Sequence, residues 1–120
     1  MTTIQRKESS PRMSQAVAVN NFVFLSGQVA DKLQGDIRQQ TTEVLAKIER
    51  LLAASNSDKS RLISVNVWLS DISHFDEMNA VYEAWLGNTH QPTRACVQAA
   101  LADPGYLIEV QAVALATPQG

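Results

Sequence analysis

The amino-acid sequence predicts an α+β domain in which two amphipathic helices cover one face of a mixed, mostly antiparallel β-sheet. Two observations lead to this prediction. Short β-prone runs alternate with two longer segments whose apolar residues recur at helical spacing. Along the chain the order is hairpin, helix, strand, helix and two strands, which favours one sheet with both helices on the same side. The 120 residues have the length of a single domain, residues 1–120.

The N-terminal part predicts a hairpin preceded by an edge strand. Ile4–Lys7 has the composition of a short edge strand, and Ser14–Val19 is a strand of small residues. The pair Asn20–Asn21 follows, and both asparagines tolerate the positive φ that a two-residue hairpin turn requires. Phe22–Ser26 is the expected return strand. It ends at Gly27, where the backbone can turn or let another group approach closely.

The first long segment predicts an amphipathic helix. Asp36, with Gln39 three positions later, resembles a capping box, so the helix is expected to begin there. It should end near Ser55–Asn56, where the helical spacing stops. The apolar residues at this spacing predict the face that packs on the sheet: Ile37, Val44, Leu45, Ile48, Leu51 and Leu52.

A strand and a second helix are predicted next. Arg61–Ser70 alternates, and the residues expected to point toward the helices are Ile63, Val65, Val67 and Leu69. Ser73 is the expected cap of the second helix, with Asp76 at the capping-box position, and Gly87–Asn88 is the expected stop. The predicted buried stripe of this helix comprises Phe75, Met78, Tyr82, Trp85 and Leu86.

The C-terminal stretch contains the strongest candidates for a functional site. Two apolar strands flank a turn at Ala102–Gly105, and each carries one charged residue, Arg94 on the first and Glu109 on the second. Alternation groups Arg94 with Cys96, Gln98 and Ala100, and groups Glu109 with Leu107, Gln111 and Val113. If the strands lie near each other, a cation and a carboxylate converge on one small polar pocket. The alternative is a structural ion pair.

The sheet face opposite the helices is predicted to be too apolar for solvent. Alternation assigns to it Phe22 or Val23, Trp68, Val97 or Cys96, and Ile108 or Val113. Such a face is expected to pack against other copies of the chain in a homo-oligomer.

Composition and charge narrow the function classes. The net charge of −2 argues against a nucleic-acid binder, which would carry a basic stripe. The single Cys96 excludes an intrachain disulfide and fits a reducing, cytoplasmic setting. His74 and His90 lie far apart without an acidic or cysteine cluster, so no metal and no cofactor is expected. Residues 1–14 lack the apolar region of a secretory signal, and no apolar run approaches the ~20 residues of a membrane helix.

Several stretches carry a resemblance to a known family. They are SQAV (Ser14–Val17), VFLSGQV (Val23–Val29), VNVWLSDISHFDEMNAVYEAW (Val65–Trp85), and PTRACVQAAL followed by IEVQAVAL. Over residues 12–116 the chain resembles the RidA, or YjgF/YER057c/UK114, family of reactive imine and enamine deaminases. The resemblance implies a chorismate-mutase-like homotrimer with clefts between subunits, which agrees with the apolar open face.

The resemblance also implies roles for five residues. Arg94 matches the family arginine that holds the substrate carboxylate, and Glu109 matches the glutamate that positions a water. Cys96 matches a cysteine whose backbone lines the cleft. Gly27 matches a glycine whose amide faces the ligand, and Asn79 matches an asparagine near the same cleft.

The chain departs from the family pattern around this cleft. Met13 stands where many members carry a tyrosine, and Gln111 stands where many carry a second acidic residue. The loop 29–35 is shorter than in the best-known members. These departures indicate a divergent subgroup and leave the physiological substrate open.

The function that the resemblance implies is hydrolysis of 2-imino or enamine acids to 2-oxo acids and ammonia. Its chemistry suits the residues, because arginine binds a carboxylate bidentately and a glutamate can accept a proton from water. The alternative is a trimeric small-carboxylate-binding protein that uses the same cleft without turnover. An RNA-directed role is disfavoured by the low positive charge.

Overall fold

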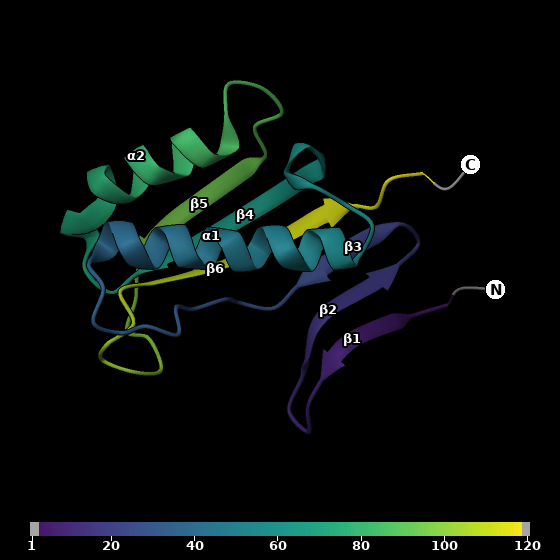
Figure 1. Ribbon diagram of the computed structural model, residues 1–120, viewed down its shortest axis with the longest axis horizontal. Helices are drawn as coiled ribbons and strands as arrows, with labels where there is room; N and C mark the ends of the chain where they lie inside the picture. Colours follow the sequence, from purple (N-terminus) through teal and green to yellow (C-terminus); the bar gives the residue numbers. More distant parts are fainter. Residues whose placement is uncertain (1–2, 119–120) are drawn as a thin grey trace.

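The structure is a computed structural model that describes residues 3–118. Within these residues six strands and two α-helices follow one another (Figure 1). Their bounds are β1 Gln5–Ser9, β2 Ser14–Val19, β3 Phe22–Leu25, α1 Ile37–Ala54, β4 Leu62–Leu69, α2 Phe75–Leu86, β5 Thr93–Gln98 and β6 Ile108–Leu115. Short 3₁₀ turns at Lys59–Arg61 and Ile72–His74 precede β4 and α2.

The strands form one sheet in the order β1-β2-β3-β6-β4-β5, and both helices lie on the same side of it (Figure 1). The β4–β5 pair is parallel and the other pairs are antiparallel, which confirms the predicted mixed, mostly antiparallel α+β sheet. β6 therefore does not pair with β5, its neighbour in the chain, because β4 lies between them. This insertion decides where the two charged strand residues lie.

Local signals in the N-terminal half are confirmed. Asn20 and Asn21 have φ of 50° and 68° and connect β2 to β3 as a tight hairpin. The Asp36 side chain accepts a hydrogen bond of 2.9 Å from the Gln39 amide, and the Gln39 side chain accepts one of 2.8 Å from the Asp36 amide. This reciprocal pair is the capping box that begins α1.

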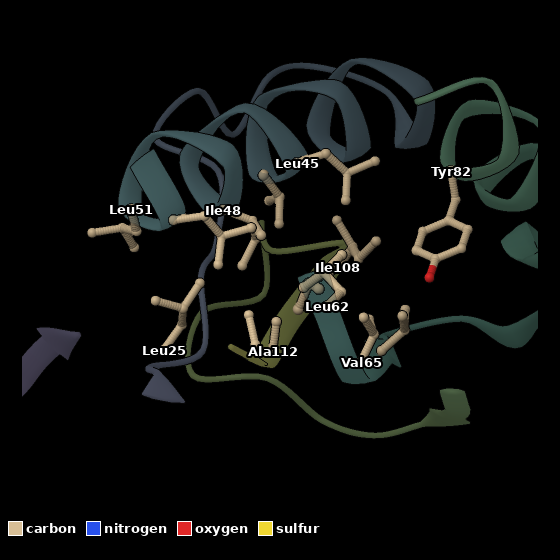
Figure 2. Packing of buried hydrophobic residues seen from close by; sticks show 14 of the residues in the cluster. Leu25, Leu45, Ile48, Leu51, Leu62, Val65, Tyr82, Ile108 and Ala112 are labelled. Atoms are coloured by element: carbon tan, nitrogen blue, oxygen red, sulfur yellow. The ribbon is translucent and has the colours of Figure 1, made fainter. Parts of the chain in front are cut away.

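The core lies between the helices and the sheet (Figure 2). The predicted apolar stripe of α1 is buried in full and packs on alternate residues of β3 and β6. From β6 the buried residues are Ile108, Val110, Ala112 and Ala114. Their neighbours in sequence, Glu109 and Gln111 among them, consequently point to the open face.

One predicted core residue of β4 is wrong. Ile63 is 37% exposed, whereas Leu62 is buried together with Val65, Val67 and Leu69. The register between β4 and β6 shifts between Leu62 and Ser64, where β4 carries an irregularity. An extra residue of this kind reverses the alternation on one side of it, so the period-two pattern does not extend to Ile63.

The predicted cap of α2 is also wrong. Ser73 lies within the 3₁₀ turn, whose cap is Asp71: its carboxylate accepts a 2.9 Å hydrogen bond from the Ser73 amide. α2 itself begins after His74, which makes no side-chain capping bond. The predicted stop is confirmed, because Gly87 ends the helix with a φ of 88°. Of the predicted stripe, Met78 and Tyr82 are buried, and Phe75 is exposed.

The sheet face opposite the helices is open and apolar along this single chain. Phe22 and Phe24 are each 42% exposed and Val97 is 50% exposed. Half-buried Trp68 lies between Glu109 and Val97 in the strand register. The apolar character predicted for this face is therefore present in the structure.

Candidate functional site

Arg94 lies on β5, an edge strand, directly beside Val65 of β4. Because Val65 faces the helices, the Arg94 side chain also lies on the helix-covered side, beneath α2. Its guanidinium carbon is 4.8 Å from the centroid of the Tyr82 ring and 5.9 Å from that of the Phe75 ring. Within residues 3–118 no carboxylate forms a salt bridge with Arg94. Two aromatic rings therefore flank this cation, and no carboxylate of the described residues pairs with it.

A cavity of about 260 Å³ adjoins Arg94 at the C-terminal end of α2. It is lined by Asn79, Tyr82, Glu83, Leu86, Gly87, Gln91, Pro92 and Arg94. The side-chain oxygen of Asn79 is buried and has no hydrogen-bond partner in the described part of the chain. A buried acceptor without a donor is unfavourable, so this oxygen is free to accept a bond from a bound group. Arg94 and Asn79, two of the predicted site residues, thus meet at one cavity.

Cys96 lies two residues beyond Arg94 on the same face and contacts the edge of the core. Burial raises the pKa of the Cys96 thiol, and the nearby Arg94 charge lowers it by less. The net upward shift keeps the thiol protonated at neutral pH. It therefore suits a lining residue better than a nucleophile.

Glu109 lies on β6 and faces the open side of the sheet, level with Trp68. Its carboxyl group lies over Gly27, just after the end of β3. A Cβ atom at Gly27 would be 2.9 Å from the Glu109 carboxyl carbon and would overlap one carboxylate oxygen. Gly27 is held in place because the next residue, Gln28, exchanges two backbone hydrogen bonds with Val110, of 2.7 and 3.0 Å. Glu109 and Gly27 thus form a second pair of predicted site residues that the structure brings together.

The two positions at which the chain departs from the family pattern differ in their surroundings. Gln111 lies two residues beyond Glu109 on the open face, and its side-chain oxygen accepts a 3.1 Å hydrogen bond from Asn66. Met13 is 41% exposed and lies between β1 and β2. Neither side chain supplies a charge to the open face.

The structure does not bring Arg94 and Glu109 together within one chain. Arg94 is level with Val65 on the helix-covered side, whereas Glu109 is level with Trp68 on the open side. The central strand β4 separates them. An ion pair between them is therefore absent from the described residues of this chain, and each charge belongs to a separate half of a site.

Sequence reasoning missed the two rings around Arg94, because it assigned both to the core stripe of α2. Phe75, Asn79 and Tyr82 are spaced by four and three residues, so they share one helical face. A polar Asn79 between two aromatic residues on one helical face was the available signal. It marks the part of α2 that covers Arg94, although Tyr82 also belongs to the hydrophobic core.

Two further findings concern metal binding and membrane-spanning helices. Within residues 3–118 no group of three His, Cys, Asp or Glu side chains is close enough to hold a metal ion. None of the helices in that range combines the length and the apolar composition that crossing a membrane would require.

Comparisons with protein families and solved structures found matches that cover most of the chain. A family profile described as endoribonuclease L-PSP matches residues 3–116. The crystal structure of NMB1025 from Neisseria meningitidis, a member of the YjgF protein family, superposes with a TM-score of 0.94 at 37% identity and covers 98% of each chain.

Curated relatives agree. Protein HMF1 of Saccharomyces cerevisiae is 42% identical over 106 residues, which cover 84% of this chain and 81% of the relative. RutC family protein YoaB of Escherichia coli is 36% identical over 112 residues, which cover 93% of this chain and 97% of the relative. The chain therefore belongs to the RidA, or YjgF/YER057c/UK114, family, and the resemblance is confirmed. Membership supports a general role in processing small molecules.

Proposed function

We propose that this protein is a deaminase that hydrolyses reactive 2-imino and enamine acids to 2-oxo acids and ammonia. The observation that carries the proposal is Arg94, a cation beside a cavity that no carboxylate of the described residues neutralises. A 2-imino acid offers the carboxylate that such a cation binds. Membership of the RidA family supports this choice of substrate class.

The proposal places the complete site between subunits of a homotrimer. Arg94 with Asn79 and Glu109 with Gly27 occupy opposite sides of the sheet, so neither pair is sufficient alone. The open face around Glu109 is apolar and suited to contact another copy. A neighbouring subunit that covers this face would set its Arg94 opposite Glu109. Each interface would then hold one cleft.

In the proposed reaction the Arg94 guanidinium holds the substrate carboxylate through two parallel hydrogen bonds. Glu109 accepts a proton from a water molecule as the water oxygen bonds to the C=N carbon and the π electrons move to nitrogen. Glu109 then returns the proton to the nitrogen of the tetrahedral intermediate. The proton of the new hydroxyl group then passes to the same nitrogen through Glu109, the C=O double bond forms and the C–N bond breaks, so one imine and one water yield one 2-oxo acid and one ammonia.

The other residues have supporting roles in this proposal. The Gly27 amide and the Cys96 backbone line the cleft, and the raised pKa of the thiol is consistent with a role for the backbone there. The Asn79 oxygen is available to a donor of the bound molecule. We place the protein in the cytoplasm, because its single cysteine needs no oxidising compartment.

A second candidate function is a trimeric small-carboxylate-binding protein without turnover. It is favoured by Met13 and Gln111, which replace polar groups that many relatives carry near the cleft. The binding role requires Arg94 alone, whereas the deaminase also requires Glu109. Substitution of Glu109 therefore distinguishes the deaminase from the binding protein.

The experiment compares wild type with Glu109→Gln, Arg94→Ala and Arg94→Lys. The substrate is 2-iminopropanoate generated in situ, with pyruvate release coupled to lactate dehydrogenase. Glu109→Gln should lower kcat by about 100-fold or more, because the amide cannot accept the proton. Its affinity for pyruvate, measured by calorimetry, should stay within a few-fold of wild type.

Arg94→Ala should abolish pyruvate binding in a protein that keeps its oligomeric mass. Arg94→Lys should restore binding poorly, because one ammonium cannot reproduce two parallel hydrogen bonds. A wild type that leaves the spontaneous rate of imine hydrolysis unchanged, but binds pyruvate, would favour the binding protein. Equal rates above background for wild type and Glu109→Gln would exclude the role of Glu109.

A further inference from the structure

We propose that Tyr82 is a positioning residue, which holds the Arg94 guanidinium for carboxylate binding through contact with its aromatic ring. This inference rests on the carboxylate site of the proposed function and adds a residue to it. On this inference the Arg94 guanidinium is oriented by an aromatic side chain of α2, and not by a carboxylate. The residue that orients Arg94 then sets carboxylate affinity through the position of the cation.

The geometry supports this role because the ring is close to the cation and itself held in place. The Arg94 guanidinium carbon lies 4.8 Å from the Tyr82 ring centroid, inside the range of a cation–π contact. Tyr82 is only 6% exposed. Its ring centroid is 6.1 Å from that of Trp85 on the next turn of α2. Figure 2 shows Tyr82 extending from α2 toward the sheet near Val65, the residue that pairs with Arg94.

An aromatic partner has a consequence that a carboxylate partner would not have. A carboxylate would occupy the N–H donors of the guanidinium and neutralise the charge that attracts the substrate. A ring attracts the cation through its π electrons and has no lone pair that competes for those donors. Within residues 3–118 Arg94 forms no ion pair, so its charge remains available. Glu83 lines the same cavity but lies outside salt-bridge distance of Arg94.

The Tyr82 ring faces Arg94 in its neutral form. Burial raises the pKa of the Tyr82 hydroxyl, and the Arg94 charge lowers it by less. The phenol is therefore neutral throughout the physiological range, and the ring contacts Arg94 as an uncharged aromatic group. Phe75 supplies a second ring, but it is 5.9 Å away and 38% exposed. Solvent weakens that contact, so Tyr82 should contribute more to the position of Arg94 than Phe75.

The test measures the dissociation constant for pyruvate, by calorimetry, in wild type, Tyr82→Phe, Tyr82→Leu and Phe75→Leu. Tyr82→Phe keeps the ring and should stay within about twofold of wild type. Tyr82→Leu should weaken binding by about five- to thirty-fold, the range expected for a cation–π contact out of water. Its kcat at saturating imine should change by less than threefold, roughly, because Glu109 is untouched. Phe75→Leu should have a smaller effect on affinity than Tyr82→Leu.

A measurement in wild type keeps the inference testable even if Tyr82→Leu fails to fold. The ring should shift the NMR signals of the Arg94 side chain upfield, and Arg94→Lys identifies those signals by their loss. Unshifted signals in wild type, or a folded Tyr82→Leu with wild-type affinity, would overturn the positioning role and leave the carboxylate site standing. A wild type without affinity for pyruvate would instead overturn the carboxylate site itself.

Discussion

At the residue scale, the position of the Glu109 carboxylate depends on the absence of a side chain at Gly27. The nearest atoms to a Cβ placed on Gly27 all belong to Glu109. The φ of Gly27 lies outside the left-handed range, so its backbone conformation is accessible to alanine. The requirement for glycine here is therefore one of space and not of backbone freedom.

Gly27→Ala should displace the Glu109 carboxylate and lower the rate of imine hydrolysis by about 10- to 100-fold, since small misplacements of a catalytic group are costly. Pyruvate affinity should change little, because Arg94 is on the other side of the sheet. The control is the double variant Gly27→Ala/Glu109→Gln. If glycine acts through the carboxylate, the two losses should not add. If Gly27→Ala hydrolysed the imine at the wild-type rate, the close approach of Gly27 to the Glu109 carboxylate would not be needed for activity.

At the scale of elements, the two helices begin in different ways. α1 starts at a complete capping box between Asp36 and Gln39. α2 has no side-chain cap and is preceded by a 3₁₀ turn that Asp71 caps. Instead, the negative charges of Asp76 and Glu77 in its first turn interact favourably with the positive end of the helix dipole. Since α1 packs on β3 and β6, its cap supports the core beneath Glu109.

Asp36→Ala should lower the free energy of unfolding by about 1 kcal/mol, within the 0.5–2 kcal/mol range of a lost N-cap. Asp36→Asn is the matched control, because it removes the same charge but keeps an acceptor for the Gln39 amide. Urea denaturation at equal protein concentration measures both. Equal losses in the two variants would mean that charge, and not the capping bond, carries the effect.

At the scale of the whole molecule, the sheet separates the two halves of the proposed site, and the half with Glu109 lies on the apolar open face. Phe24 lies on this face and is 42% exposed. Arg94 reaches the opposite side of the sheet, under α2. A chain in isolation therefore has both groups of the proposed chemistry but no place where they meet.

Phe24→Lys should prevent assembly, because burying the lysine charge in an apolar interface would require the charge to lose its hydration, which is energetically unfavourable. Light scattering at micromolar concentration should give the monomer mass, against a trimer for wild type, and imine hydrolysis should fall to background. Ala46→Lys, on the exposed face of α1, adds the same charge and should remain trimeric and active. A monomeric wild type, or a monomeric Phe24→Lys with full activity, would refute the intersubunit site.

Much of the fold could be predicted from local patterns. The Asn20–Asn21 turn, the Asp36 capping box, the α1 stripe and the Gly87 stop all depend on residues a few positions apart. Alternation also placed Cys96 on the face of Arg94. Two predictions that failed, Ile63 in the core and Ser73 as a cap, both lie where an irregular residue or a 3₁₀ turn interrupts the regular period. Phe75, also predicted to be buried, is exposed at the start of α2.

The sequence by itself determined which residues share a face, which segments are helices and which family the chain belongs to. Only the tertiary structure decided that β4 lies between β5 and β6, and that the registers of these two strands against β4 point Arg94 and Glu109 to opposite sides of the sheet. The physical reason is that side-chain alternation is a property of one strand. Strand order and the relative facing of two strands depend on hydrogen bonds between residues far apart in the chain. The ring contact of Tyr82 with Arg94 follows from the same long-range packing.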